Sequence, residues 1–214
     1  MLRAGRNLVR LVENAFIQAR YDALAPFETF IGTKFLFRAA RRLRRRDAAL
    51  AALRPGERLA TALQAMGPSF IKLGQALSIR ADLIGEAIAA DLAALQDRLP
   101  PFPAEEARRM IEAELGHSVA ELFRSFDDQP VAAASIAQVH FAVTTEGEDV
   151  AVKVLRPGIH AAFARDIELF LWLGRLVERT QPQLRRLRPV AVVETLAETV
   201  RQEMDLRFEA AGAS

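Results

Sequence analysis

The sequence contains no cysteine among its 214 residues. Disulfide bonds, thiolate zinc sites and cysteine nucleophiles are therefore excluded, and a reducing compartment is natural for the chain. Aromatic residues are also scarce, at 7%, whereas alanine and leucine are prominent among the hydrophobic residues, which make up 51%. This composition favours a mainly helical structure packed by alanine and leucine over a β-sandwich.

Long apolar runs and leader features are missing as well. No stretch approaches the roughly 20 consecutive apolar residues of a transmembrane helix, and the start has neither the apolar core nor the cleavage site of a signal peptide. We therefore expect a cytoplasmic chain. A GxGxxG fingerprint for flavin is absent, and His117, His140 and His160 form no plausible iron triad. Each histidine is expected to be structural or exposed, and no metal ligand is predicted.

The formal net charge of +2 is unevenly distributed, because the first fifty residues are rich in arginine and residues 82–128 are largely acidic. Residues 8–19 follow the spacing of an amphipathic helix, and residues 38–46 form a dense basic run. Such segments can lie on an anionic membrane, where each basic residue contributes about 1 kcal/mol. A solvated helix packed on the rest of the protein is the alternative. Nucleic-acid binding is not expected, since a stacking platform and a recognition fold are absent.

Proline and glycine residues divide the next part of the chain into helices. We expect helices over residues 57–66, 69–80, 86–98 and 104–115, with Gly116 as a left-handed C-terminal cap. The segment Ser118–Glu121 has the form of a capping box, and it predicts a short helix that runs into Phe126.

The hydrophobic period changes after Asp128. Residues 131–144 and 150–155 alternate or run apolar with β-branched residues, and a turn around Gly147 separates them, which predicts a β-hairpin. Helices return over residues 159–180 and 189–211, with a break at Pro182. The predicted fold class is therefore α+β and mainly helical.

Lys153 lies among β-branched residues in the second predicted strand. A strand places such a lysine on one face while its neighbours are buried. Protein kinases use a strand lysine of this kind to hold the α- and β-phosphates, and they pair it with a glutamate on the following helix. The alternative is a lysine on the solvent face of an edge strand, which is common.

Four small residues stand upstream, where a kinase has its glycine-rich loop: Ala132, Ala133, Ala134 and Ser135. Small side chains let backbone amides approach a phosphate group, and alanine does so with less conformational freedom than glycine. The alternative is a tight crossing of two strands.

Carboxylates follow on the last predicted helix, at Glu203, Asp205 and Glu209. Asp205 and Glu209 share a face of an ideal helix, whereas Glu203 is about 200° from Asp205. All three cannot point one way from an unbroken helix.

An earlier helix carries a second polar pair, Lys72 and Gln75, three residues apart on one face. Gly74 lies beside them, and it permits the close approach of another backbone or a ligand despite a helix penalty of about 1 kcal/mol. The spacing alone indicates a polar face with a close contact.

These segments together resemble the UbiB/aarF family of atypical kinase-like proteins. Lys72–Gln75 matches the KxGQ motif of that family. Other segments agree in order, from about Leu59 to the C-terminus: Leu95–Asp97 with Pro100-Pro101, the alanine-rich loop through His140, Val152–Gly158, and Glu203 and Asp205 followed by Glu209-Ala210. The preceding extension, including Ala19–Asp22, is similar to that of proteobacterial members.

The resemblance implies a kinase-like fold in which the KxGQ helix covers the place where a protein substrate would otherwise lie. It implies that Lys153 contacts the phosphates of ATP and that Glu209 is its helix partner. Lys72 and Gln75 would project toward the nucleotide, and Glu203 and Asp205 would engage the added helical layer. The loop over the phosphates would consist of Ala132, Ala133, Ala134 and Ser135.

The family supports ubiquinone biosynthesis at a membrane, with ATP binding or hydrolysis rather than clear protein kinase activity. The resemblance therefore implies ATP and Mg²⁺ as cofactors. It implies a nucleotide, a membrane lipid or polyprenyl-quinone precursor, and ubiquinone biosynthesis enzymes as partners, with a peripheral location at the inner membrane. A membrane-surface scaffold for lipid-modifying enzymes, without catalysis, is the alternative. Direct hydroxylation of the quinone ring is disfavoured by the missing flavin and iron signatures.

Three regions are expected: a basic N-terminal helical region at 1–56, a KxGQ-type helical extension at 57–125, and an incomplete kinase-like small lobe at 126–214. Gly212 departs from the family, which usually has asparagine there. The sequence ends at Ser214, before the large lobe that supplies the magnesium ligands. We therefore expect no catalysis from these residues alone.

Overall fold

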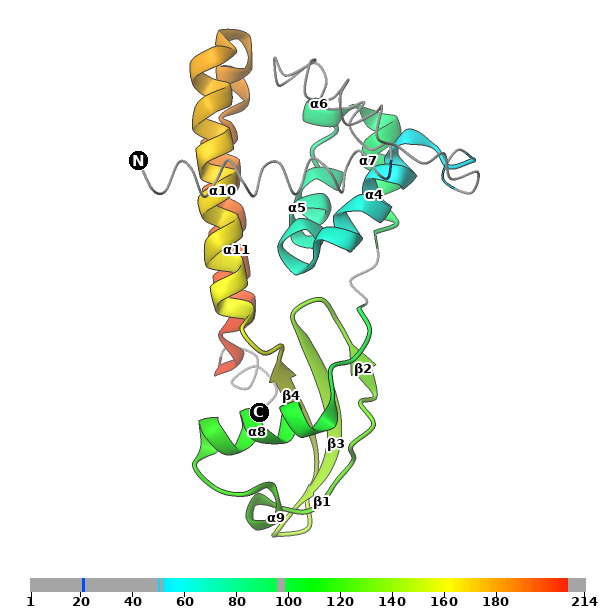
Figure 1. Cartoon of the computed structure of the whole chain (residues 1–214), viewed down its shortest axis with the longest axis vertical. Helices are drawn as coiled ribbons and strands as arrows, with labels where there is room; N and C mark the ends of the chain where they lie inside the picture. Colours follow the sequence, from blue (N-terminus) through cyan, green and yellow to red (C-terminus); the bar gives the residue numbers. More distant parts are fainter. Residues whose placement is uncertain (1–20, 22–49, 51, 96–98, 208–214) are drawn as a thin grey trace. The chain divides into compact units, whose positions relative to one another are not determined.

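The computed structural model describes residues 21, 50, 52–95 and 99–207 (Figure 1). The predicted amphipathic and basic segments at 8–19 and 38–46, together with Glu209 and Gly212, lie outside the described residues. Helices and strands follow in this order: α4 (Pro55–Met66), α5 (Pro68–Ser78), α6 (Ala81–Ile84), α7 (Glu86–Ala93), α8 (Ala104–Leu115), α9 (Val119–Leu122), β1 (Phe123–Phe126), β2 (Ala132–Ala133), β3 (Ala137–Thr144), β4 (Asp149–Leu155), α10 (Ile159–Thr180), the 3-10 helix η2 (Pro182–Leu187) and α11 (Pro189–Met204).

Two of the first helices begin at a proline. Pro55 opens α4 and Pro68 opens α5, although the sequence predicted that each helix starts just after its proline. A proline has no N–H to donate, and the first turn of a helix needs none there, so proline fits the first helical position. Gly85, with φ of 84°, ends α6, and α7 then stops at Ala93, earlier than predicted.

The helices α4, α5 and α7 pack on one another around a small apolar core. Leu59 and Leu63 of α4, Ile71 of α5 and Leu92 of α7 are fully or almost fully buried. The ring of Phe70 also meets the ring of Phe170 on α10 edge to face, at a centroid distance of 5.0 Å.

The helices α10 and α11 run side by side as a hairpin, shown in yellow to red in Figure 1. Gly174 makes this close approach possible, because a Cβ at this position would stand 3.4 Å from the Cα of Val190. The predicted break at Pro182 is confirmed, and it takes the form of η2. Among the described residues, no helix combines the length and apolar character needed to cross a bilayer.

The strands form one antiparallel sheet in which β3 is central. β4 pairs with one edge of β3, and both β1 and β2 pair with its other edge. The predicted hairpin of β3 and β4 is confirmed, with Gly147 at a φ of 92° in the turn. β1 was not predicted, because the capping box at Ser118 indicated a helix as far as Phe126. That helix ends at Leu122, and Phe126 pairs with Ala142 instead.

One face of this sheet is covered by α8, as Figure 1 shows. Ala107 and Ile111 of α8 form a buried cluster with Val119 and with Val154 of β4. Gly116 has the predicted left-handed conformation, with φ of 73°, at the end of α8. The covered face is therefore fixed by apolar burial, and the opposite face holds the candidate site.

The described chain divides into two compact units, and each has its own core. Of the described residues, the first unit contains those up to 95 together with 163–200, and the second contains 99–162 together with 201–207. The structure thus groups α8 and α9 with the sheet, whereas the expected extension at 57–125 included them. The mixed, mainly helical fold class with a small antiparallel sheet is confirmed.

Candidate functional site

Lys153 lies on β4, directly opposite Val139 of β3. Two residues further along the strands Phe141 pairs with Ala151, and residues two apart on a strand share a face. Phe141 is 58% exposed, which is unusual for a phenylalanine on a sheet. Lys153 therefore shares a face with an exposed aromatic side chain and a small residue.

The opposite face carries the alternate residues of the same strands. Gln138, His140 and Ala142 of β3 are buried there, as is Val154 of β4. Because α8 covers that face, the face that carries Lys153 is the open one. A shallow hollow of about 710 Å³ lies on the open face, lined by Ser125, Asp127, Phe141, Val143, Asp149 and Ala151 among others.

The small-residue segment forms a tight turn rather than an open loop. Ala132 and Ala133 make up β2, opposite Val139 and Gln138. The N–H of Ala134 donates to the carbonyl oxygen of Ala137 at 2.8 Å, and Ser135 is fully buried. The four residues thus lie beside β3, the strand that pairs with the Lys153 strand β4. Ala132 is the most accessible of them.

Arg156 holds this turn in place, and the sequence did not single it out as a site residue. Its Nε and Nη2 donate to the carbonyl oxygen of Ala134 at 3.1 and 2.9 Å, and Nη2 also donates to the carbonyl oxygen of Pro100 at 2.9 Å. The guanidinium lies 5.7 Å from the ring centre of Phe102, within cation–π range. In the sequence, its position directly after the predicted second strand was the signal that could have identified Arg156.

A buried polar network lies behind the sheet. The Oε1 of Gln138 accepts a hydrogen bond from the N–H of Phe102 at 3.0 Å, and its amide Nε2 lies 2.9 Å from Nε2 of His140. The Nδ1 of His140 lies 2.8 Å from the carbonyl oxygen of Asp127. A carbonyl only accepts, so Nδ1 carries the proton and Nε2 accepts from Gln138. His140 is therefore structural, as expected.

The C-terminal carboxylates do not follow one continuous helix. α11 ends at Met204, and Asp205 is not helical. Arg207 donates to both carboxylate oxygens of Asp205, at 2.9 and 3.0 Å, and these hydrogen bonds hold the pKa of Asp205 below its usual range. The break removes the geometric objection that Glu203 and Asp205 must point in opposite directions.

Lys72 and Gln75 are half-buried and share one side of α5, while its two other sides make packing contacts. One side of α5 packs toward α4 and α7 through Gly74, and another lines an apolar pocket through Leu73 and Leu77. A Cβ on Gly74 would stand 2.7 Å from the Cδ atoms of Leu63 and Leu95. The close contact at Gly74 is therefore with leucine side chains of the packed helices, where the sequence predicted the approach of another backbone or a ligand.

The predicted site residues fall into both compact units. Lys72 and Gln75 belong to the first unit, whereas Lys153, the turn at 132–135, Glu203 and Asp205 belong to the second. Within the described residues, no three histidine, aspartate or glutamate side chains gather as a metal site requires. A lysine beside a tight turn of small residues on an open sheet face suits the phosphates of a nucleotide.

The sequence of the chain matches a known protein family. The ABC1 atypical kinase-like domain matches residues 94–214. The "Probable protein kinase UbiB" of Marinobacter nauticus is 48% identical over 159 residues, which is 74% of this chain and 29% of that protein. The protein of the same name from Aeromonas hydrophila is 49% identical over 162 residues, 75% of this chain and 30% of that protein.

A solved structure is also similar: "The complex structure of Rv3197-erythromycin from Mycobacterium tuberculosis", with 34% identity, a TM-score of 0.45, and coverage of 65% of this chain and 35% of that one. The chain spans about 30% of the length of the curated relatives that it matches. Because the family domain matches more than half of the chain, the protein belongs to the ABC1 atypical kinase-like family and is similar to its UbiB members.

Proposed function

We propose that this chain contributes the nucleotide-contacting face of an ATP-dependent, UbiB-type kinase-like protein that supports ubiquinone biosynthesis. The observation that supports it best is the open face of the sheet, where Lys153 stands beside the exposed pair Phe141 and Ala151. A base would lie flat on that pair, and Lys153 would neutralise the phosphates. The turn from Ala132 to Ser135 would cover the phosphates from the side.

The remaining predicted residues have supporting roles in this proposal. Lys72 and Gln75 would approach the nucleotide from the KxGQ helix, and Glu209 would pair with Lys153. Glu203 and Asp205 would engage that helix. Mg²⁺, which the family relationship suggests, would neutralise the phosphate charge of bound ATP. Membership of the family and the UbiB names of the relatives support the link to ubiquinone.

A lysine-directed ATP probe tests this proposal. The lysines of the sequence are Lys34, Lys72 and Lys153. An acyl-phosphate derivative of ATP acylates an amine that lies near its phosphates, and peptide mass spectrometry identifies the lysine. We expect rapid acylation of Lys153 that excess ATP suppresses, and slow acylation of Lys34 that ATP leaves unchanged. Acylation of Lys153 that is insensitive to ATP would contradict the proposal.

The affinity for ATP provides a second measurement. A hydrogen bond to a charged group contributes about 1.5–3 kcal/mol, so we expect Lys153→Ala to weaken binding by roughly 10- to 100-fold. The matched control is Arg124→Ala, which removes an exposed cation of β1 whose one hydrogen bond within the described residues goes to the carbonyl oxygen of Thr145. Equal affinities for ATP in the two variants would remove Lys153 from the site.

A further inference from the structure

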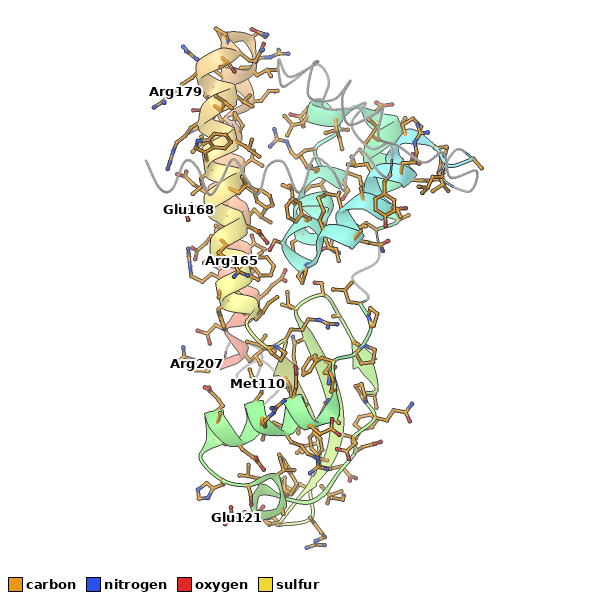
Figure 2. All side chains as sticks on the ribbon, in the orientation of Figure 1. Met110, Glu121, Arg165, Glu168, Arg179 and Arg207 are labelled. Carbon is orange, nitrogen blue, oxygen red and sulfur yellow. The ribbon has the colours of Figure 1, made fainter. Side chains whose placement is uncertain are left out.

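The end of the α10–η2–α11 hairpin carries a dense positive charge that the nucleotide proposal does not use. Residues 175–188 include five arginines and a single acidic residue, Glu178. All five arginine side chains are exposed: Arg175, Arg179, Arg185, Arg186 and Arg188. Figure 2 shows Arg179 near the C-terminal end of α10, directed outward from the helix.

Little of this charge is neutralised by other side chains. Nε of Arg185 donates to the backbone carbonyl oxygen of Glu178 at 2.6 Å, near the end of α10. The carboxylate of Glu178 accepts from the N–H of Val190 at 3.3 Å, at the start of α11. Within the part of the chain that the structure describes, the other four arginines form no ion pair. The charge is therefore available to an external anion.

The arginines also shape the surface. A shallow hollow of about 450 Å³ is lined by Arg175, Glu178, Arg179 and Arg185. Because Glu178 is already bonded to the start of α11, three guanidinium groups dominate this lining. Guanidinium groups match phosphate oxygens in charge and in geometry.

Trp172 lies on the same side of α10 as the arginines. At 3.6 residues per turn, Trp172, Arg175 and Arg179 fall within about 60° of one another. The opposite side of α10 lines an apolar pocket of about 230 Å³ through Phe170, Leu173, Gly174 and Val177. On the side away from that pocket, Arg175 and Arg179 are exposed and Trp172 is half-buried beside them.

We propose that this arginine and tryptophan face, defined by Trp172, Arg175, Arg179 and Arg185, docks on a membrane surface that contains anionic phospholipids. Each basic residue near such a surface contributes an attraction, and tryptophan is enriched at membrane interfaces. Binders of single-stranded nucleic acid stack successive bases on several aromatic side chains, and this face presents a single one. The proposal is independent of nucleotide binding and of the basic segment at 38–46.

Trp172 supplies the test, because it is the single tryptophan of the sequence. The full chain is mixed with vesicles of phosphatidylcholine, with or without phosphatidylglycerol, whose acyl chains are brominated near the headgroup. We expect quenching of Trp172 fluorescence by the anionic vesicles and none by the neutral ones. Attachment through a distant segment would sediment the protein with the vesicles but leave Trp172 unquenched, and this result would overturn the proposal.

Arg175→Gln combined with Arg179→Gln removes two charges that make no described ion pair. We expect partition through this face to fall by about fivefold for each arginine, roughly 25-fold for both, with loss of quenching. Arg109→Gln combined with Arg124→Gln removes the same charge from exposed positions of the second unit and should retain the quenching. Circular dichroism confirms that each variant folds.

Two further outcomes would overturn the proposal. Equal loss of quenching in both double variants would show a response to net charge alone. Capture of the chain by RNA together with indifference to anionic vesicles would assign the face to nucleic acid. Acylation of Lys153 by the ATP probe is measured separately, so failure of the nucleotide proposal is distinguishable from failure of this one.

Discussion

Arg156 illustrates how a single side chain can organise a candidate binding turn. Its guanidinium reaches the carbonyl oxygens of Ala134 and Pro100, and its own N–H donates to Ile136 at 2.8 Å. The residue thus connects the end of β4, the turn before β3 and the segment before α8. Lysine cannot reproduce these contacts, because it lacks the planar fork of arginine.

We expect Arg156→Lys to destabilise the second unit by about 2 kcal/mol, since an ammonium group cannot replace the guanidinium hydrogen bonds to the carbonyl oxygens of Ala134 and Pro100. Thermal unfolding measures the change, and hydrogen exchange of the Ala134 amide should accelerate in the variant. Arg124→Lys is the control, because Arg124 is exposed and donates to a single carbonyl oxygen. An unchanged exchange rate at Ala134 would show that Arg156 does not hold the turn.

At the residue level, the strand position of Lys153 was predictable from the sequence, because alternation along a strand places it on one face. The role of Gly74 was not, since a glycine that accommodates Leu63 looks in the sequence like one that admits a ligand. Arg156 was missed because its acceptors are backbone carbonyls, which carry no signature in a sequence.

Among the elements, α5 depends on the absence of a side chain at Gly74. A β-branched residue there would collide with Leu63 and Leu95, and overpacking of this kind costs typically 1–3 kcal/mol. We therefore expect Gly74→Val to lower the unfolding temperature. Ala76→Val is the control, because Ala76 is half-buried on the same helix. Valine is a poorer helix former than alanine but a better one than glycine, so a larger loss of stability in Gly74→Val than in Ala76→Val would come from packing.

Equal unfolding temperatures for the two valine variants would contradict the packing role of Gly74. A selective effect of Gly74→Val would instead show that the motif's glycine sets the distance between α5 and its neighbours. ATP affinity can then be measured in Gly74→Ala, where any change would reflect a shifted helix rather than a lost ligand contact.

The elements themselves were largely predictable from local signals. The helix at 104–115, the hairpin around Gly147 and the helix at 159–180 lie where the sequence placed them. β1 was missed because the capping box at Ser118 is a correct local signal for one helical turn only. Residues 123–126 form a strand because they pair with β3 and because Phe126 packs against the core. Both interactions involve residues distant in the sequence.

For the whole molecule, the division into two units predicts two separable cores. Ile71 is buried in the first and Ile111 in the second. Ile→Val in a core costs typically 0.5–1.5 kcal/mol. Trp172 lies in the first unit, so its fluorescence should report a shift for Ile71→Val and little change for Ile111→Val. Far-UV circular dichroism should detect both.

Coincident shifts of Trp172 fluorescence in the two valine variants would show one cooperative unit instead. This division was not predictable from the sequence. The apolar side of α8 shows only that the helix packs on something, and the packing against Val154 of β4 is visible only in the structure. The start of the family match at residue 94, close to the start of the second unit, agrees with the grouping of α8 and the sheet.

The clamp of Arg156 also has a thermodynamic consequence. A flexible phosphate loop loses conformational entropy when a ligand orders it, at about 1–2 kcal/mol for each residue fixed. The turn at 132–135 is already held by hydrogen bonds from Arg156 and from within the turn itself. Any anion that binds beside it would therefore meet a preorganised backbone, and the calorimetric entropy of binding would carry little cost from ordering the protein.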